Sequence, residues 1–313
     1  MPLHPDAERC LAMARAAGAR PYQEMTPAEA RAAYRAGRAA VAPDPAPVAL
    51  AQDLAPTDLA FRLRRYRPAG SAAETVLPSL LYLHGGGWLF GDLDSHDGTC
   101  RLLCNAAQCQ ILSVDYRLCP EHRFPTAVED AAAALRYLHA NAASLAADPA
   151  RLMVGGDSAG GNLAAVLALM ARDGALPALI HQMLVYPATD LTMAQPAYQR
   201  ATQGLPLTAA TMAWFIGHYL NGADASDWRA SPLRAASLTG VAPATVLSAW
   251  HDPLCDDATA YAARLAQDGV RVTALHFADQ MHGFLGQGRI IRSAGTAIAM
   301  LGACLAQAIA ESR

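Results

Sequence analysis

The chain has 313 residues, of which 53% are hydrophobic and 16% are charged, and its formal net charge at neutral pH is −3. This composition supplies a large buried core and excludes an intrinsically disordered chain. The 24 Lys and Arg residues are scattered and form no basic patch, so we expect a small-molecule partner and no nucleic acid.

The seven cysteines are an odd number, and the N-terminus lacks the basic and apolar regions of a secretory signal. No uninterrupted apolar run reaches the roughly 18 residues that a membrane span needs. We therefore expect a cytoplasmic protein with no membrane partner. Cys100, Cys104 and Cys109 lie close together in the sequence, but their spacing matches no zinc pattern. We expect buried thiols there, and neither a metal nor a cofactor.

The N-terminal part of the chain predicts two helices, a connector and two strands. Ala- and Arg-rich segments at 5–17 and 26–39 are typical of helices, and the second opens with Thr and Pro, a favoured helix start. A Pro-rich connector at 42–47 marks a boundary. Two antiparallel strands are expected at 48–53 and 58–67.

From residue 80 onward, short apolar runs alternate with helical segments. The expected strands are 80–83, 110–114, 152–154, 181–185, 244–248 and 270–275, and the expected helices are 126–139, 159–172, 257–268 and 293–310. Continuous apolar strands separated by helices predict an α/β fold with a mostly parallel sheet covered on both faces.

One stretch interrupts this alternation. Residues 190–237 are too many for an ordinary connection, and long insertions in compact domains are often lids or binding elements. We expect this stretch and residues 1–45 to form a helical cap, with residues 46–189 and 238–313 forming the catalytic domain.

The pentapeptide Gly156-Asp157-Ser158-Ala159-Gly160 lies between an expected strand and an expected helix. In that context glycines permit a tight, strained turn that lifts a serine hydroxyl clear of the sheet at a helix N-terminus. Ser158 is therefore the predicted nucleophile. Taken alone, the same pattern also suits a phosphate-binding turn or a simple loop.

A second glycine motif, His84-Gly85-Gly86-Gly87-Trp88, ends the strand at 80–83. Consecutive glycines leave backbone N–H groups free to stabilise an oxyanion formed by attack of the serine. The predicted donors are the N–H groups of Gly86, Gly87 and Ala159. A flexible hinge is the alternative. An oxyanion hole is favoured because each of the two glycine motifs follows its own parallel strand.

In this type of site the acid and then the histidine follow the serine along the chain. Five histidines do so: His181, His218, His251, His276 and His282. His282 follows the last strand, where a loop can return it to the serine, and is the predicted base. Of Asp252, Asp256 and Asp257, the first lies directly at a strand end, whereas the other two resemble helix N-terminal residues. Asp252 is the predicted acid.

Together these residues resemble the hormone-sensitive lipase family, in particular its bacterial esterases, which have the α/β-hydrolase fold. The resemblance covers about residues 80–285 and rests on the two glycine motifs and four further segments: Asp115–Leu118, Pro120–Pro125, Asp252–Leu254 and His282–Phe284. It implies Ser158, His282 and Asp252 as a triad, the three oxyanion donors above, and a short- or medium-chain ester as substrate. Family members often form dimers, which implies a homodimer. Cys119 and Cys255 depart from the family pattern.

Trp88, Trp214 and Phe215 are expected to line the substrate pocket, although core packing suits the last two equally well. The predicted function is a serine carboxylesterase that works through an acyl-enzyme. An amidase, such as an aryl formamidase, could use the same triad. A non-catalytic receptor on this fold would lack the histidine, which is present here.

Overall fold

The computed structural model describes residues 2–201 and 203–312. Its strands are β1 (Leu50–Leu54), β2 (Leu63–Arg67), β3 (Leu77–Leu83), β4 (Gln110–Val114), β5 (Ala147–Asp157), β6 (His181–Val185), β7 (Ala244–His251) and β8 (Val272–Met281). Its helices are α1 (Pro5–Ala16), α2 (Pro27–Val41), α3 (Asp97–Ala107), α4 (Thr126–Ala140), α5 (Ala159–Arg172), α6 (Ala197–Arg200), α7 (Ala209–Leu220), α8 (Cys255–Gln267) and α9 (Arg292–Glu311). Short 3₁₀ helices are η1 (Tyr22–Glu24), η2 (Pro232–Arg234) and η3 (Phe284–Gly286).

Within the described residues the strands form one sheet in the order β1-β2-β4-β3-β5-β6-β7-β8. Strand β2 is antiparallel to both of its neighbours, and the ladder from β4 to β8 is parallel throughout. The α/β-hydrolase fold and the antiparallel pairing of the first two strands are therefore confirmed. Parallel strands bring their carboxyl ends to one edge, so the loops after β3, β5, β7 and β8 lie together.

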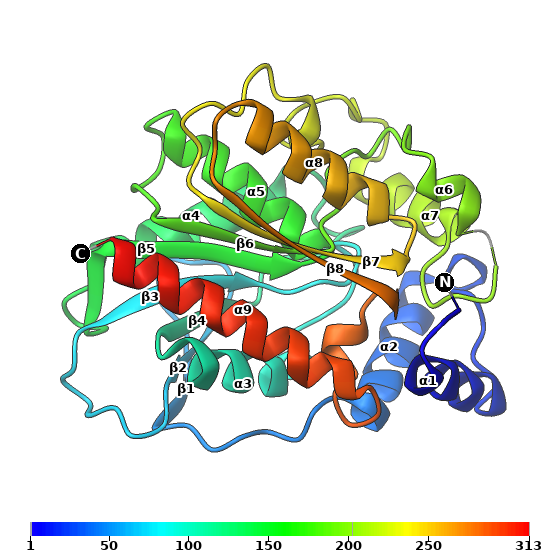
Figure 1. Ribbon diagram of the computed structural model, residues 1–313, viewed down its shortest axis with the longest axis horizontal. Coiled ribbons are helices and arrows are strands. Elements are labelled where there is room, and N and C mark those ends of the chain that lie inside the picture. Colours follow the sequence, from blue (N-terminus) through cyan, green and yellow to red (C-terminus); the bar gives the residue numbers. More distant parts are fainter. Residues whose placement is uncertain (1, 202, 313) are drawn as a thin grey trace.

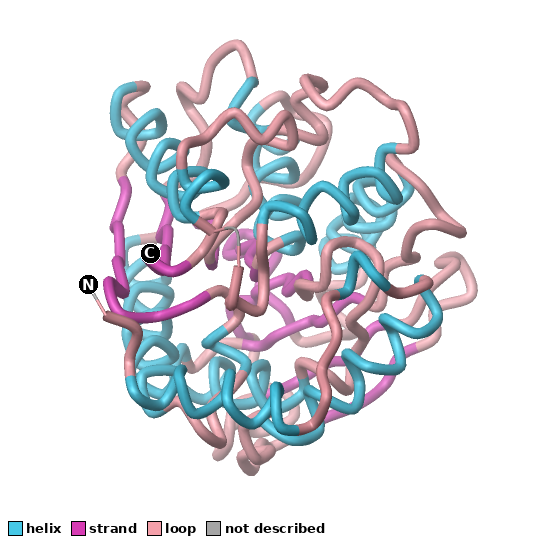
Figure 2. Tube along the Cα trace, turned by 90° about the vertical axis from the view of Figure 1, so that its right-hand side faces the viewer, coloured by secondary structure: helices cyan, strands magenta, loops and turns pink. Residues whose placement is uncertain are grey.

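Helices cover both faces of the twisted sheet (Figures 1 and 2). Alternate side chains of each strand enter different cores, as the pleat requires. Leu81 and Leu83 of β3 belong to the core that also contains residues of α4, α5 and α8, whereas Leu80 and Tyr82 belong to the core that contains residues of α1, α3 and α9. The central strands β3, β4 and β6 are buried on both faces, so they contain mostly apolar residues, whereas β1 is largely exposed.

The predicted elements are found with shifted ends. The expected strand 58–67 begins only at Leu63, because residues before it form a turn, and β5 begins five residues earlier than expected, at Ala147. Helix α3 was not predicted. The insertion at 190–237 holds α6, α7 and η2, joined by long loops.

Helix α2 begins as its sequence predicts. The Thr26 hydroxyl accepts a hydrogen bond from the Glu29 N–H (3.3 Å), and the Glu29 carboxylate accepts one from the Thr26 N–H (2.8 Å). This reciprocal cap satisfies N–H groups that have no partner inside the helix. Gln23, just before the helix, accepts a hydrogen bond from Thr211 of α7 (2.7 Å). The N-terminal segment and the insertion thus lie side by side, at the right of Figure 1.

By length and composition alone, α9 is the one helix among the described residues that could cross a membrane. Its buried residues recur every three or four positions, from Ala294 to Ile309, and they pack in the core shared with α1 and α3. Gly302 lies directly against Ala106 at the end of α3. The apolar face of α9 is therefore used within the fold, as in a core helix of an α/β domain.

Candidate active site

Ser158 lies at the turn between β5 and α5, with backbone angles φ 56° and ψ −116°. Positive φ is costly for a residue with a Cβ, so the surrounding structure must hold this turn in place. The Ser158 side chain does not cap the helix that follows. Its hydroxyl is therefore free to make other contacts, although the residue is only 8% exposed.

Gly160 makes this turn possible because the first turn of α5 packs against the end of β3. A Cβ at position 160 would overlap the carbonyl oxygen of Leu83. Any side chain there would push the helix away from the strand that carries the second glycine motif. The pattern that predicted the nucleophile thus has a steric cause in this structure.

The structure brings His282 and Asp252 to the serine. His282 directly follows β8, and its Nε2 is 2.9 Å from the Ser158 Oγ. Its Nδ1 is 2.7 Å from one carboxylate oxygen of Asp252, which directly follows β7 and is 1% exposed. The other carboxylate oxygen accepts a hydrogen bond from the Leu254 N–H (2.8 Å), which fixes the rotation of the carboxylate.

This line of contacts determines which histidine nitrogen carries the proton. A carboxylate can only accept, so Nδ1 must donate to Asp252. The lone pair of Nε2 then faces the Ser158 hydroxyl, which donates to it. The Tyr186 ring lies 4.7 Å from the imidazole and restricts its movement. The arrangement can therefore move a proton from serine to histidine and stabilise the imidazolium that results.

The other histidines and acids lie elsewhere. His181 bonds to Thr245 inside the sheet, and burial lowers its pKa to about 4. His276 bonds to Ser248, and His218 packs against Trp214 on α7. His251 is the last residue of β7.

The two remaining acids also have structural partners. Asp256 forms an ion pair with Arg200 at 2.9 Å. Asp257 is fully buried, and one of its oxygens accepts the N–H groups of Thr189 and Asp190 (both 2.9 Å). Burial raises the pKa of Asp257 well above its usual range. Asp257 thus holds the loop after β6.

The glycine loop after β3 lies beside the serine, because β3 and β5 are paired, with Leu83 next to Gly156. Among the described residues, no acceptor is found for the backbone N–H of Gly86 or Gly87. The N–H of Ala159, the first residue of α5, has no acceptor within its helix. Gly87 has φ 59°, and a Cβ there would overlap the Phe215 ring. The loop can stabilise negative charge at a carbonyl oxygen attacked by the serine.

The three aromatic residues predicted for the pocket are placed differently from one another. Trp88 is 1% exposed and stacks on Tyr219 of α7 at 4.4 Å, so its ring is part of the core. Phe215 packs directly on Gly87. Trp214 is half-buried beside Phe215, with ring centres 5.2 Å apart.

The clustered cysteines are thiols in the core. Cys100, Cys104 and Cys109 are fully buried, and Cys104 donates a hydrogen bond to the Cys109 carbonyl (3.1 Å). Burial raises the pKa of Cys104 to about 12, which disfavours the thiolate that a metal needs. Among the described residues, no group of three or more His, Cys, Asp or Glu side chains is arranged to hold a metal ion.

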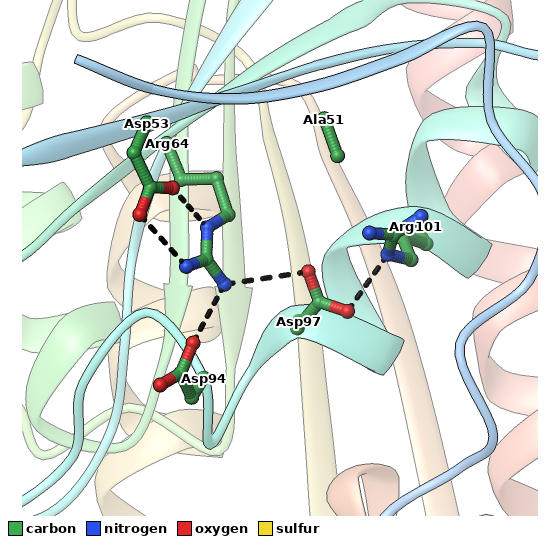
Figure 3. Close-up of a pocket in the computed structure, with 6 residues that line it drawn as sticks. All are labelled: Ala51, Asp53, Arg64, Asp94, Asp97 and Arg101. Carbon is green, nitrogen blue, oxygen red and sulfur yellow. Dashed lines mark hydrogen bonds and ion pairs between the residues drawn. The ribbon is translucent and has the colours of Figure 1, made fainter.

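A charged hollow of about 450 Å³ lies away from the serine, over β1, β2 and α3 (Figure 3). Arg64 at its centre is surrounded by Asp53, Asp94 and Asp97, and Arg101 pairs with Asp97 at 2.7 Å. Its cationic groups are already paired with carboxylates, so the hollow offers no free group for the chemistry at Ser158.

Sequence reasoning missed the contacts that α2 makes with the loops of the site. Arg31 donates to the Leu89 carbonyl (2.9 Å), and Arg38 donates to the carbonyls of Ser95 (2.7 Å) and Gly286 (2.6 Å). The only sequence signal is that these arginines are seven residues apart, on one face of the expected helix.

Comparison with known proteins identifies the fold and the family of the chain. Residues 80–286 match the family described as alpha/beta hydrolase fold. The chain is 46% identical to the carboxylic ester hydrolase LipN of Mycobacterium tuberculosis, over 71% of this chain and 60% of LipN. It is 41% identical to an ethyl acetate hydrolase of Pseudomonas putida, over 78% of each chain. An α/β-hydrolase enzyme from the metagenome of Lake Arreo, Spain, has a crystal structure that superposes with a TM-score of 0.93 at 39% identity, covering 98% of this chain and 99% of that one.

These similarities include both the fold and the sequence around the site. The chain therefore belongs to the hormone-sensitive lipase family of α/β hydrolases, with the bacterial carboxylesterases, and is a carboxylic ester hydrolase.

Proposed function

We propose that the protein is a serine carboxylesterase in which Ser158 is the nucleophile, His282 the general base and Asp252 the acid. The observation that carries this proposal is the continuous line of short contacts, 2.9 Å from serine to histidine and 2.7 Å from histidine to aspartate. Each residue comes from the end of a different parallel strand, where the fold holds it rigidly.

The proposed reaction is a two-step acyl transfer. The Ser158 oxygen attacks the ester carbonyl while His282 takes the hydroxyl proton, and the N–H groups of Gly86, Gly87 and Ala159 stabilise the oxyanion. The carbon–oxygen bond to the alcohol then breaks, and His282 returns its proton to the leaving alcohol, which leaves an acyl-enzyme. Water attacks this ester in the same way, with His282 again as base, and releases the acid and the free serine.

The proposed substrates are short- to medium-chain acyl esters, and residues 1–45 and 190–237 would form the cap over the site. Phe215 supports this size limit, because its ring packs on Gly87 and occupies the space next to the proposed oxyanion donors. Tyr22 of η1 and Phe90 adjoin the same ring, with centres 6.4 Å and 5.2 Å away. We propose Phe215 and Trp214 as pocket residues, and we assign the Trp88 ring to the hydrophobic core. Cytoplasmic location is likewise proposed, because all seven cysteines are free thiols.

The decisive experiment combines one substitution with one covalent label. Ser158→Ala should reduce turnover of a nitrophenyl ester to a residual rate about 10³–10⁴ times the uncatalysed rate. An organophosphonate should label the wild-type protein once, at Ser158, and fail to label the variant. Undiminished turnover by the variant would refute the proposal.

Two substrate series define the scope. Nitrophenyl esters from acetate to dodecanoate should show a maximum among the shorter chains. Formamides offered beside the esters distinguish an esterase from an amidase, and a higher kcat/KM on the formamide would reassign the activity.

A further inference from the structure

One face of α2 lies along the loop that follows β3. Arg31 donates from Nε to the Leu89 carbonyl (2.9 Å), and the Tyr34 ring stacks on Phe90 with centres 4.3 Å apart. Arg38 donates from Nε and Nη2 to the Ser95 carbonyl (3.2 and 2.7 Å). Positions 31, 34 and 38 are three and then four residues apart, so they share one helix face. This face contacts the loop at three successive points.

Arg38 also contacts a second loop of the site. Its Nη1 donates to the Gly286 carbonyl (2.6 Å), and the guanidinium lies directly against the Gly286 backbone. Gly286 ends η3, which begins two residues after His282. The N–H groups of a guanidinium lie in one rigid plane and point outward from different edges, so one side chain can join two backbone segments. Arg38 thus links the loop carrying the histidine to the loop carrying the oxyanion donors.

A chain of contacts continues from Ser95 to the serine. The Ser95 hydroxyl lies 3.0 Å from Nδ1 of His96, and Nε2 of His96 lies 3.4 Å from the carboxylate of Asp157. That carboxylate accepts the Gly85 N–H at 3.0 Å. Asp157 adjoins Ser158, and Gly85 begins the glycine loop.

The charge on Asp157 also depends on these neighbours. Burial alone would raise the pKa of Asp157, but His96, the Tyr82 hydroxyl and the more distant Arg38 together hold this pKa below its usual range. The Tyr82 hydroxyl donates to the carboxylate at 2.8 Å. The carboxylate therefore stays ionised and continues to accept the hydrogen bond from the Gly85 N–H.

We propose that Arg38 is a positioning residue for catalysis, which holds the oxyanion loop and the histidine loop in register with each other. The proposal rests on the function proposed above. Arg38 itself touches neither the serine nor the proposed oxyanion donors, so it acts only through the loops that it joins.

The expected effect follows from the geometry that an oxyanion hole needs. Donors must lie about 2.7–3.1 Å from the developing oxyanion, and a misplacement of about 1 Å can cost about 10²-fold in rate. Ground-state binding of the ester depends little on these donors. Losing Arg38 should therefore reduce kcat about 10- to 100-fold and change KM by less than about threefold.

Arg38→Met removes the hydrogen bonds and keeps most of the apolar stem. Arg289→Met is the matched control: Arg289 bonds to the Ala39 carbonyl (2.8 Å) and to Asp44 (2.8 Å), so it joins α2 to the segment after η3 without contacting the oxyanion loop. Rates are expressed per serine titrated by an organophosphonate, which removes unfolded protein from the comparison. We expect kcat per titrated site to fall for Arg38→Met only.

A trifluoromethyl ketone, which forms an oxyanion on the serine, should bind more weakly to Arg38→Met by about the same factor as the loss in kcat. Ethylguanidinium should restore part of the kcat of Arg38→Ala. Equal kcat and equal ketone affinity in the Arg38→Met and Arg289→Met variants would overturn the proposal.

If Arg38→Met fails to fold, Arg38→Lys is used to test the proposal. It keeps the charge but cannot reach both carbonyls, so the proposal requires a lower kcat with unchanged KM, and wild-type kcat refutes it. Failure of the proposed function is a separate result. It would appear as undiminished turnover by the Ser158→Ala variant with Arg38 left in place.

Discussion

The sharpest test of the proton pathway is Asp252→Asn, which keeps the shape of the side chain and removes its charge. Asp252 is 1% exposed and lies 2.7 Å from His282 Nδ1, so the new amide must face the imidazole at the same place. If the amide N–H₂ faces Nδ1, the imidazole proton moves to Nε2, which then cannot accept the Ser158 proton. If the amide oxygen faces Nδ1, the imidazolium loses its counter-charge. The Leu254 N–H donates to the other oxygen of this side chain and holds the amide oxygen there, so the first case applies. We therefore expect kcat to fall about 10⁴-fold, which corresponds to about 5.5 kcal/mol in the barrier.

The measurement is a pre-steady-state burst with a nitrophenyl ester, which separates acylation from later steps. Both steps use His282 as base, so both should slow. Asp256→Asn is the control, because Asp256 pairs with Arg200 and does not touch the imidazole. A kcat for Asp252→Asn within tenfold of the wild-type value would refute the assignment of Asp252 and the tautomer argument with it.

Further predictions concern the loop, the sheet and pH. Gly87→Ala places a Cβ in the Phe215 ring, so kcat per titrated serine should fall about 10²–10³-fold, and Phe215→Ala in the same chain should restore part of it. Leu81→Ala, at a fully buried position of β3, should lower the free energy of unfolding in urea by about 2–5 kcal/mol. His181 has a pKa lowered by burial from 6.5 to about 4, so the unfolded chain takes up its proton first as pH falls. Its stabilisation is complete above pH 6.5, and about 2 kcal/mol should be lost by pH 5. His181→Gln should remove this part of the pH dependence, and an unchanged dependence would contradict the argument.

The central strands were predictable because they are buried on both faces, whereas β1 at the edge of the sheet is largely exposed. The run 80–83 is apolar throughout, and that pattern does not depend on distant contacts. Helix α3 was not predicted, because its sequence signals are weaker. Its N-cap, His96, makes no side-chain capping bond, and its buried face is built from Gly, Thr and Cys as well as Leu. Its buried positions 100, 103, 104 and 107 follow helical spacing, but they are Cys, Leu and Ala, and no side-chain capping bond marks the start of the helix.

The residues proposed as the triad could be predicted from the sequence because the topology of the sheet does most of the positioning. Each follows a parallel strand, so a correct reading of the strands places Ser158, Asp252 and His282 at one sheet edge before any distance is known. The surroundings of the aromatic residues proposed or rejected for the pocket do not follow from topology. Trp88 stacks on Tyr219 and Phe215 packs on Gly87 through contacts between α7 and the loop after β3, and such contacts depend on how α7 is placed in the folded molecule.

The same distinction explains why the N-terminal helix matters more than its sequence indicates. A strand end determines where a side chain begins. An oxyanion donor, however, must be placed to within a fraction of an ångström. The glycines that leave its N–H without an acceptor also make the loop flexible. Something outside the loop must therefore restore its rigidity. In this structure Arg31, Tyr34 and Arg38 of α2 contact the loop's carbonyls and the Phe90 ring. Their partners are mostly backbone atoms, which have no sequence signature. A contact of this kind is therefore found only in the folded molecule, and the proposal for Arg38 predicts that the rate of the reaction depends on it.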